Sequence, residues 1–423
     1  MAGAIPHQLL PESAAIAESG RVSVGGIDLI DLAEEFGTPL FVYDEEQLRQ
    51  RCRDAVEAFP DGVSYASKAF LCTAMAQLVH EEGMQIDVAT GGELFVARNA
   101  GVPADRMIFH GNNKSIDELR YALTEGVHHL MVDSFDELDR IDMLFAELGI
   151  VANVMLRITP GVEVHTHEFI ATGQDDSKFG FTVSTGLALK AVERAQASPA
   201  VNLVGIHAHI GSQVFSIDSF EKAVAIVADF CADFSIEELS VGGGLGVAYV
   251  EGEEAPPFAA WGASMQRACR DAGFKGRITA EPGRSIVAAA AVTLYTVGTI
   301  KTLEGIRTFV AVDGGMSDNP RPVLYGSGYE TFLPRAGSTP RDLQVRVVGK
   351  HCESGDMLVR EGSVPSDIAV GDILATPVTG AYGHSMASNY QKVTRPPVVF
   401  VRDGEARLVV RRETFDDLIR LDV

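Results

Sequence analysis

Basic residues are scarce in this chain of 423 residues. Its 35 lysines and arginines stand against 58 acidic residues, which leaves a formal net charge of -23 at pH 7. A strongly negative protein repels phosphate backbones and anionic lipid headgroups. The charge therefore argues against nucleic-acid and membrane partners. Any anionic substrate has to be met by individually placed arginines.

Cysteine pairs of the CxxC type are missing, and the five cysteines are scattered at positions 52, 72, 231, 269 and 352. This spacing argues against a disulfide framework or a zinc cluster and favours a reducing compartment. Long apolar runs are missing as well, since none reaches the roughly 18 residues of a membrane span. The N-terminus shows no charged-then-apolar signal pattern. We expect a cytoplasmic protein.

What the chain does contain is a regular alternation of strand-like and helix-like segments. We predict eight short strands, at 63–67, 85–89, 107–110, 129–133, 153–158, 204–210, 238–242 and 277–281. Helical patterns lie between them, for example at 92–99, 115–125, 135–148 and 220–234. Eight parallel strands of this kind predict a (β/α)8 barrel of about 250 residues. A doubly wound open sheet is the alternative.

The pattern changes after residue 285. Strand-like runs follow at 308–312, 344–348, 356–360, 372–375 and 398–401, and Asp403-Gly404 predicts a hairpin between the last run and 406–410. We therefore predict an α/β chain in three parts: an N-terminal segment (1–43) that joins the second domain, the barrel (44–285), and a mainly β domain (286–423). Residues 1–30 have little periodicity and are interpreted as a polar lead-in.

Barrel enzymes work at the carboxyl ends of their strands. Chemically versatile residues stand at these positions, namely Lys68, Asp87, Arg157, His207, His209, Ser212, Gly242–Gly246 and Glu281–Arg284. A lysine there can act as an amine nucleophile if neighbours lower its pKa, or it can simply be solvated. Glu281 can be a solvated carboxylate, or it can hold a pyridine nitrogen protonated.

Two further patterns in the barrel have competing interpretations. The loop Gly242–Gly246 can bind a phosphate through its backbone N–H groups, or it can be a tight structural turn. Val247 stands where a dinucleotide-binding fold needs its third glycine, which argues against that fold. His207 and His209 alternate on one strand face, so they can be metal ligands, as in a metal-dependent hydrolase. His209 can instead stack on an aromatic cofactor.

Outside the barrel, two polar segments stand out, at 352–356 and 380–390. Cys352, beside Glu353, can deliver a proton, although a free cysteine is more often a small buried apolar side chain. Arg321 and Tyr325 can receive a carboxylate, or they can be a solvated arginine and a packed tyrosine. The long loop from residue 159 to residue 180 can cover the mouth of the barrel.

These segments and their order along the chain resemble those of the fold-type III decarboxylases that use pyridoxal 5'-phosphate (PLP). Within that family the chain resembles most the branch acting on diaminopimelate. Nine motifs carry the resemblance over nearly the whole chain: GTPLFVYD (37–44), YASKAF (65–70), HAHIGSQ (207–213), GGGLG (242–246), EPGRS (281–285), DGGMSDNPRPVLY (313–325), CESGD (352–356), GAYGHSMASNY (380–390) and RRETFDDL (411–418). The loop 161–180 also resembles that branch rather than ornithine or arginine relatives.

The resemblance implies a role for each matching position. Lys68 is the residue that binds PLP covalently, His209 stacks on its ring, and Glu281 pairs with its pyridine nitrogen. The phosphate is held by Ser212, Gly243, Gly244 and the backbone of Glu281, Pro282, Gly283 and Arg284, with Tyr382; Asp87 and Arg157 support lysine and cofactor. Substrate contacts fall on Arg284, Arg321, Tyr325, Tyr382 and Glu353, and Cys352 is the proton donor.

The activity implied is decarboxylation of meso-2,6-diaminopimelate to L-lysine and CO2, the last step of lysine biosynthesis. The resemblance also implies a homodimer whose second copy contributes Cys352 and Glu353 to the site. One alternative is a decarboxylase of another basic amino acid, of the D-ornithine or lysine type. Another is a catalytically silent PLP-binding homologue.

Overall fold

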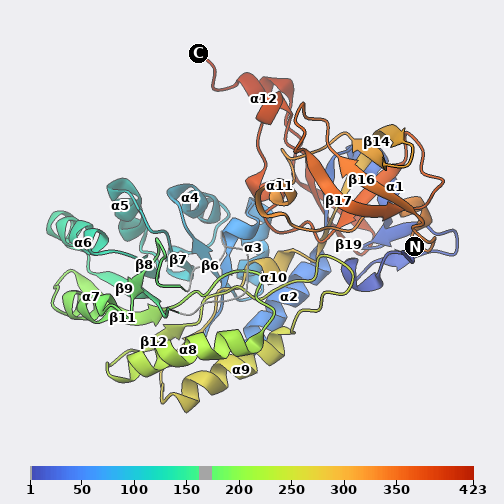
Figure 1. Cartoon of the computed structure of the whole chain (residues 1–423). Helices are drawn as coiled ribbons and strands as arrows, with labels where there is room; N and C mark the ends of the chain where they lie inside the picture. Colours follow the sequence, from blue (N-terminus) through green and yellow to red (C-terminus); the bar gives the residue numbers. More distant parts are fainter. Residues whose placement is uncertain (1, 162–173) are drawn as a thin grey trace. The chain divides into compact units, whose positions relative to one another are not determined.

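The computed structural model describes residues 2–161 and 174–423 of the chain (Figure 1). Its contacts divide the chain into two compact units. The first comprises residues 51–246 and 255–285, and the second comprises residues 1–50, 247–254 and 286–423. We refer to them as the barrel unit and the β unit.

Eight parallel strands form the barrel unit, each hydrogen-bonded to the next in chain order. They are β5 (Ser64–Ala66), β6 (Gln85–Val88), β7 (Met107–Phe109), β8 (His129–Val132), β9 (Ala152–Thr159), β11 (Val201–His207), β12 (Glu238–Ser240) and β13 (Arg277–Thr279). A parallel bridge between Val63 and Ala280 joins the last strand to the first, and the Ser64 N–H donates to the Ala280 carbonyl at 2.9 Å. The predicted barrel is confirmed, and the open sheet is excluded by this closure.

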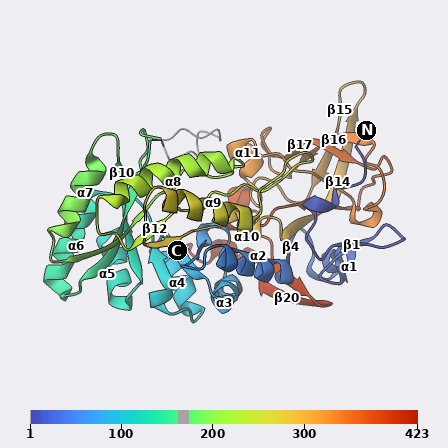
Figure 2. The ribbon, with the colours of Figure 1, turned by 90° about the horizontal axis from the view of Figure 1, so that it is seen from below.

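Helices alternate with these strands and lie outside them, as the ribbon shows (Figure 1). They are α2 (Glu45–Ala58), α3 (Thr73–Glu81), α4 (Gly91–Asn99), α5 (Ile116–Glu125), α6 (Phe135–Leu148), α7 (Leu187–Gln196), α8 (Ile217–Ala232) and α9 (Phe258–Asp271). Helices α8 and α9 run side by side in both views (Figures 1 and 2). Side-chain caps start several of them; Ser115, for example, accepts the Glu118 N–H in a capping box.

The sixth barrel strand is shifted from its predicted range of 204–210. Strand β11 ends at His207, which pairs with Arg157 of β9 and Ser240 of β12. Beyond it the chain turns away toward Gly211, whose φ of 148° lies in a region that suits glycine. His209 therefore lies in the turn after the strand. The prediction that His207 and His209 alternate on one face of this strand was wrong.

Strands dominate the β unit. One sheet has the order β17-β16-β15-β14-β4-β19-β20, with β18 paired to β14. The strands are β4 (Leu40–Asp44), β14 (Ala291–Leu303), β15 (Arg307–Val312), β16 (Leu343–Val348), β17 (Met357–Val364), β18 (Ile373–Pro377), β19 (Val398–Arg402) and β20 (Glu405–Val410). The hairpin at Asp403-Gly404 is confirmed, and both residues have positive φ, as such turns require. Strand β14 was not among the predicted strands.

The interpretation of residues 1–30 as a polar lead-in was wrong. They form a three-stranded sheet, β1 (Ala15–Ile16), β2 (Val22–Val24) and β3 (Ile27–Asp28), which leads into α1 (Leu29–Phe36). Val22, Val24 and Leu29 are fully buried in an apolar cluster that also holds Leu40 and Val292. Strands of two or three residues are too short for a periodic pattern to show.

Among the described residues, three further α-helices are short: α10 (Arg284–Val287), α11 (Arg321–Tyr325) and α12 (Phe415–Ile419). A two-residue strand, β10 (Phe181–Thr182), pairs with the end of β9. Within the described residues, no helix combines the length and the apolar character needed to cross a membrane.

Candidate active site

The carboxyl ends of the barrel strands bring the predicted barrel residues to one edge. Lys68 lies on a short 3-10 turn, Ser67–Ala69, directly after β5. The Tyr65 hydroxyl supports this turn by donating to the Phe70 carbonyl at 2.7 Å. Ser67 and Ala69 are buried, whereas the Lys68 side chain is exposed. The amine is thus presented to the mouth of the barrel by a rigid backbone.

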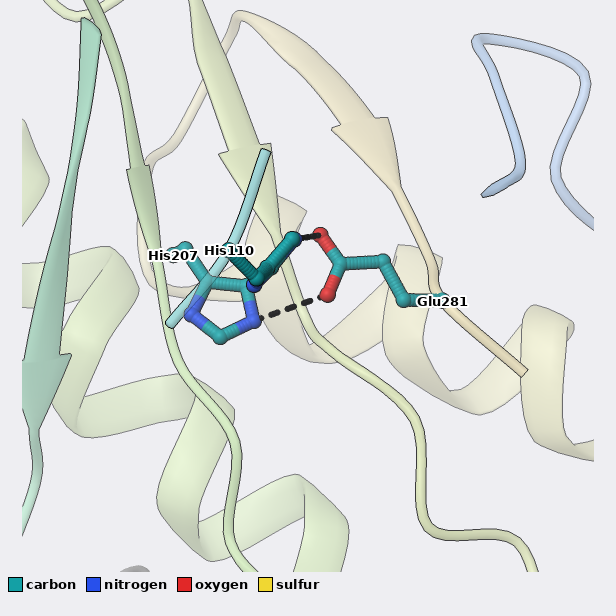
Figure 3. A group of neighbouring side chains, drawn as sticks. All are labelled: His110, His207 and Glu281. Carbon is teal, nitrogen blue, oxygen red and sulfur yellow. Dashed lines mark hydrogen bonds and ion pairs between the residues drawn. The ribbon is translucent and has the colours of Figure 1, made fainter. Parts of the chain in front are cut away.

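Glu281, the residue predicted to face a pyridine nitrogen, is buried directly after β13. The Ser240 hydroxyl donates to its Oε1 at 2.9 Å, and Nε2 of His207 lies 2.9 Å from its Oε2 (Figure 3). Burial alone raises the pKa of this carboxyl, but His207 and His110 outweigh burial and bring the pKa well below its usual range. Glu281 is therefore ionised, and His207 donates from Nε2.

His209 is joined to the glycine loop after β12 and has left the strand face that it was predicted to share with His207. Its Nδ1 accepts the backbone N–H of Gly243 at 3.2 Å. Burial, followed by the charge of Lys68, holds the pKa of His209 well below its usual range. The ring is therefore neutral.

The glycine loop after β12 lies where the ends of three strands approach each other closely. A Cβ on Gly243 would lie 2.2 Å from the Glu281 carbonyl oxygen, and one on Gly244 would lie 2.1 Å from that of Gly211. Only glycine fits such approaches. Beside the loop, Nη2 of Arg284 donates to the Ser212 hydroxyl at 2.9 Å. Ser212 and Arg284, both predicted to bind the phosphate, are thus joined by a hydrogen bond.

Arg157 is buried at the end of β9, and its guanidinium lies 4.2 Å from the centre of the Phe179 ring. Phe179 belongs to the long loop, and its carbonyl accepts the Thr159 hydroxyl at 2.8 Å. Asp133 Oδ2, after β8, accepts the Gly180 N–H at 3.3 Å. The loop 159–180 was predicted to cover the barrel mouth, and its residues 162–173 lie outside the described part of the chain.

The sequence reasoning passed over His110 and Asp133, which stand directly after β7 and β8. His110 Nε2 lies 3.5 Å from Glu281 Oε1 and 3.8 Å from Asp87 Oδ1. Both residues could have been found by the strand-end rule that identified Lys68 and Asp87, had it been applied to all eight strands.

The other predicted residues belong to the β unit. Arg321, on α11, is buried, and its Nη1 donates to the Tyr329 hydroxyl at 2.5 Å. Its guanidinium also lies 4.3 Å from the centre of the Tyr249 ring. Tyr325 ends the same helix and is half-buried. The sequence reasoning did not identify Tyr249 or Tyr329, because nothing local links them to Arg321.

Cys352 and Glu353 are exposed and tied to one turn of the same unit. The Cys352 N–H donates to Oε1 of Gln391 at 3.0 Å, and the Tyr390 hydroxyl donates to Glu353 Oε1 at 2.5 Å. Gln391 has a φ of 52°, which is unusual for a residue with a side chain. Tyr382, with a φ of 58°, lies earlier in the same motif. Cys352 is therefore not the buried apolar side chain that we considered as the alternative.

This donor set fits PLP. An exposed amine, a neutral imidazole, a buried ionised carboxylate and a glycine loop beside an arginine match the aldehyde, ring, pyridine nitrogen and phosphate of that cofactor. His110, His207 and Glu281 also place one atom each within 4.8 Å of one another, a spacing that could suit a metal ion. The two oxygens of Glu281 already accept hydrogen bonds, one from the Ser240 hydroxyl and one from His207.

The fold and the site together define a PLP-dependent decarboxylase of the barrel type. Residues 45–288 match the family described as "Pyridoxal-dependent decarboxylase, pyridoxal binding domain". Over its whole length the chain is 46% identical to the diaminopimelate decarboxylase of Mycobacterium tuberculosis, covering 98% of this chain and 97% of that protein. It is 45% identical to that of Bacillus subtilis, covering 96% of each. The chain belongs to the diaminopimelate decarboxylase family.

Solved structures of diaminopimelate decarboxylases have the same fold as this chain. The diaminopimelate decarboxylase of M. jannaschii has a TM-score of 0.90 at 35% identity, covering 97% of this chain and 98% of that one. That of Helicobacter pylori, complexed with L-lysine, has a TM-score of 0.86 at 32% identity, covering 93% and 98%. A lysine/ornithine decarboxylase of Vibrio vulnificus has a TM-score of 0.75 at 22% identity, covering 89% and 98%, and shares the fold alone.

Proposed function

We propose that this enzyme decarboxylates meso-2,6-diaminopimelate to L-lysine and CO2. The observation that carries the proposal is the 46% identity over 98% of the chain to a diaminopimelate decarboxylase, combined with a barrel edge that suits PLP. Related diaminopimelate decarboxylases have been solved with L-lysine, the product expected here. A decarboxylase of another basic amino acid remains the alternative, supported only by a fold likeness at 22% identity.

Bound PLP supplies the electron-accepting ring that takes up the electron pair when the bond between the α-carbon and its carboxylate breaks. The residues of this chain provide the rest. Lys68 would anchor the cofactor, Glu281 would face the ring nitrogen, and His209 would lie against the ring. Ser212, Gly243 and Gly244 would hold the phosphate with the backbone of 281–284 and Tyr382. Asp87 and Arg157 complete the electrostatic environment of the lysine.

The substrate contacts in this proposal come from Arg284, Arg321, Tyr325 and Tyr382, with Glu353 for the distal amino group. Of these residues, Arg321 fits the proposed role best, because Tyr249 and Tyr329 hold its guanidinium in place. After the C–C bond has broken and carbon dioxide has left, Cys352 would donate a proton to the α-carbon, so that a C–H bond takes the place of the broken bond.

We further propose that the enzyme is a homodimer in which Cys352 and Glu353 act in the site of the other copy. Both side chains are exposed in the chain by itself, as such a role requires. The five cysteines are free thiols, and a proton-donating thiol needs a reducing environment, so we place the enzyme in the cytoplasm.

The proposal is tested on the purified PLP-loaded protein. We expect meso-diaminopimelate to give stoichiometric CO2 and L-lysine, and we expect L-ornithine, D-ornithine and L-lysine to react at least about 100-fold more slowly. Preference for a substrate without the distal carboxylate would favour the alternative function. Absence of turnover with all four would favour the silent homologue.

The anchor is tested with Lys68→Ala. This variant should lose turnover and should no longer retain PLP after borohydride reduction and mass spectrometry. Lys190→Ala, at an exposed lysine of α7, is the matched control and should behave as wild type. Full activity of Lys68→Ala would refute the assignment.

A further inference from the structure

His110 is a buried titratable residue of the barrel that the roles above do not use. It follows β7 directly, is 7% exposed, and donates its backbone N–H to the Val88 carbonyl at 2.7 Å. Its position is therefore determined by the sheet, at the same edge as Lys68 and Glu281. A buried histidine becomes charged only if nearby groups offset the cost of burial, because burial disfavours its charged form.

The imidazole of His110 lies between two buried carboxylates. Nε2 is 3.5 Å from Oε1 of Glu281 and 3.8 Å from Oδ1 of Asp87. The His110 ring also meets the His207 ring edge-on, with centroids 5.2 Å apart. Figure 3 shows His110 and His207 approaching the two oxygens of Glu281. One imidazole therefore lies near each oxygen of this carboxylate, and Oε1 also accepts the Ser240 hydroxyl.

The two carboxylates cannot both be ionised in a buried site without a nearby cation. Burial lowers the pKa of His110, but the charges of Asp87 and Glu281 outweigh burial and raise it overall. His207 has the opposite balance, since burial lowers its pKa despite Glu281. Arg157 also faces the cluster and opposes a charge on His110. Of the two imidazoles, His110 is the one that lies between two carboxylates, and these favour its charged form.

We propose that His110 is a positioning residue whose cationic ring, held between Asp87 and Glu281, keeps the Glu281 carboxylate ionised for the ring nitrogen of PLP. This inference rests on the proposed function of the site. Without the cation, a proton is shared between Asp87 and Glu281, and Glu281 is no longer a full acceptor. The ring nitrogen then loses its proton more easily, and the ring accepts an electron pair less well.

The test compares His110→Gln with His110→Lys, which restores a cation. His129→Gln is the matched control, because His129 is a buried histidine at the amino end of β8. We expect His110→Gln to lower kcat about 10- to 100-fold while the KM for diaminopimelate changes less than about threefold. The pH at which the bound cofactor's visible absorbance titrates should shift by about one unit in His110→Gln, and His110→Lys should recover part of both effects.

Equal losses in His110→Gln and His110→Lys, with an unchanged spectral titration, would show a merely steric role and overturn the proposal. Should both variants fail to fold, the imidazole carbon resonances of His110 in the wild-type PLP-loaded protein decide the question. We expect a protonated ring at pH 7.5, and a neutral ring would overturn the proposal. These spectroscopic readouts do not depend on substrate, so they remain informative even if diaminopimelate is not turned over.

Discussion

The backbone N–H of Gly243 donates to Nδ1 of His209 at 3.2 Å, which joins the glycine loop after β12 to the ring after β11. Because a donor faces Nδ1, that nitrogen carries the lone pair, and the ring hydrogen is on Nε2. The same residue that shapes the proposed phosphate site thus orients the ring proposed to stack on PLP. In the proposed site, one short loop would position both the cofactor ring and its phosphate.

We predict that Gly243→Ala weakens PLP binding by at least about tenfold, with a smaller loss of thermal stability. The added Cβ would lie 2.2 Å from the Glu281 carbonyl oxygen, so the loop has to move away from β13 and from His209. The measurement is the PLP dissociation constant from a titration of apoprotein. Gly92→Ala, in α4, is the control, because its Cβ would meet nothing closer than 3.7 Å. Equal affinities for the two variants would contradict the prediction.

We predict that the free energy of unfolding of Asp318→Asn increases relative to that of the wild type as the pH rises from 4.5 to 8. Burial raises the pKa of Asp318 from 3.8 to about 7, although the Tyr295 hydroxyl and the Gly315 N–H both donate to it. A carboxyl with a raised pKa stabilises the folded state only while it is protonated. Its contribution is complete below pH 3.8 and is lost as the pH rises to about 7.

The full shift of the Asp318 pKa, from 3.8 to about 7, corresponds to about 4 kcal/mol. Denaturant unfolding of both proteins at pH 4.5 and at pH 8 measures how their difference in free energy of unfolding changes. The control is Asp416→Asn, at an exposed carboxylate of α12, for which the change with pH should be within about 0.5 kcal/mol. If the difference in free energy of unfolding between Asp318→Asn and wild type does not change with pH, the pKa of Asp318 lies near its ordinary value.

We predict that Gln391→Ala lowers kcat about 3- to 10-fold and leaves the spectrum of bound PLP unchanged. The Cys352 N–H loses its acceptor, and one hydrogen bond is worth about 0.5–1.5 kcal/mol. The thiol then visits its working position less often. Gln391→Glu keeps an oxygen acceptor and should retain most of the wild-type rate. If the two variants lose the same activity, the hydrogen bond to Cys352 is not the cause.

We predict that two inactive variants, Lys68→Ala and Cys352→Ala, regain about one quarter of wild-type activity when their subunits are mixed and allowed to exchange. If Lys68 and Cys352 of one site come from different copies, half of the dimers are mixed, and each mixed dimer holds one intact site. Mixing Lys68→Ala with a variant that carries both substitutions is the control and should stay inactive. No recovery in the first mixture would mean that one chain supplies both residues.

Local patterns predicted a large part of the site. The strand-end rule found Lys68, Asp87, His209 and Glu281, because the end of a short buried strand is a local feature of the sequence. It could have found His110 as well, since this residue ends a predicted strand. The rule could not show that His110 lies 3.5 Å from Glu281, because β7 and β13 are not neighbours in the sheet.

The sequence by itself determined the number of barrel strands, the residue types at their ends and the family resemblance, since all of these depend on spacing along the chain. Only the tertiary structure decided which of these residues meet. It placed His110 between two carboxylates and Arg321 against the rings of Tyr249 and Tyr329. It also showed that residues 1–30, predicted as a polar lead-in, contribute to an apolar core. The physical reason is that burial and charge pairing act between segments far apart in sequence, where no periodic pattern can show them.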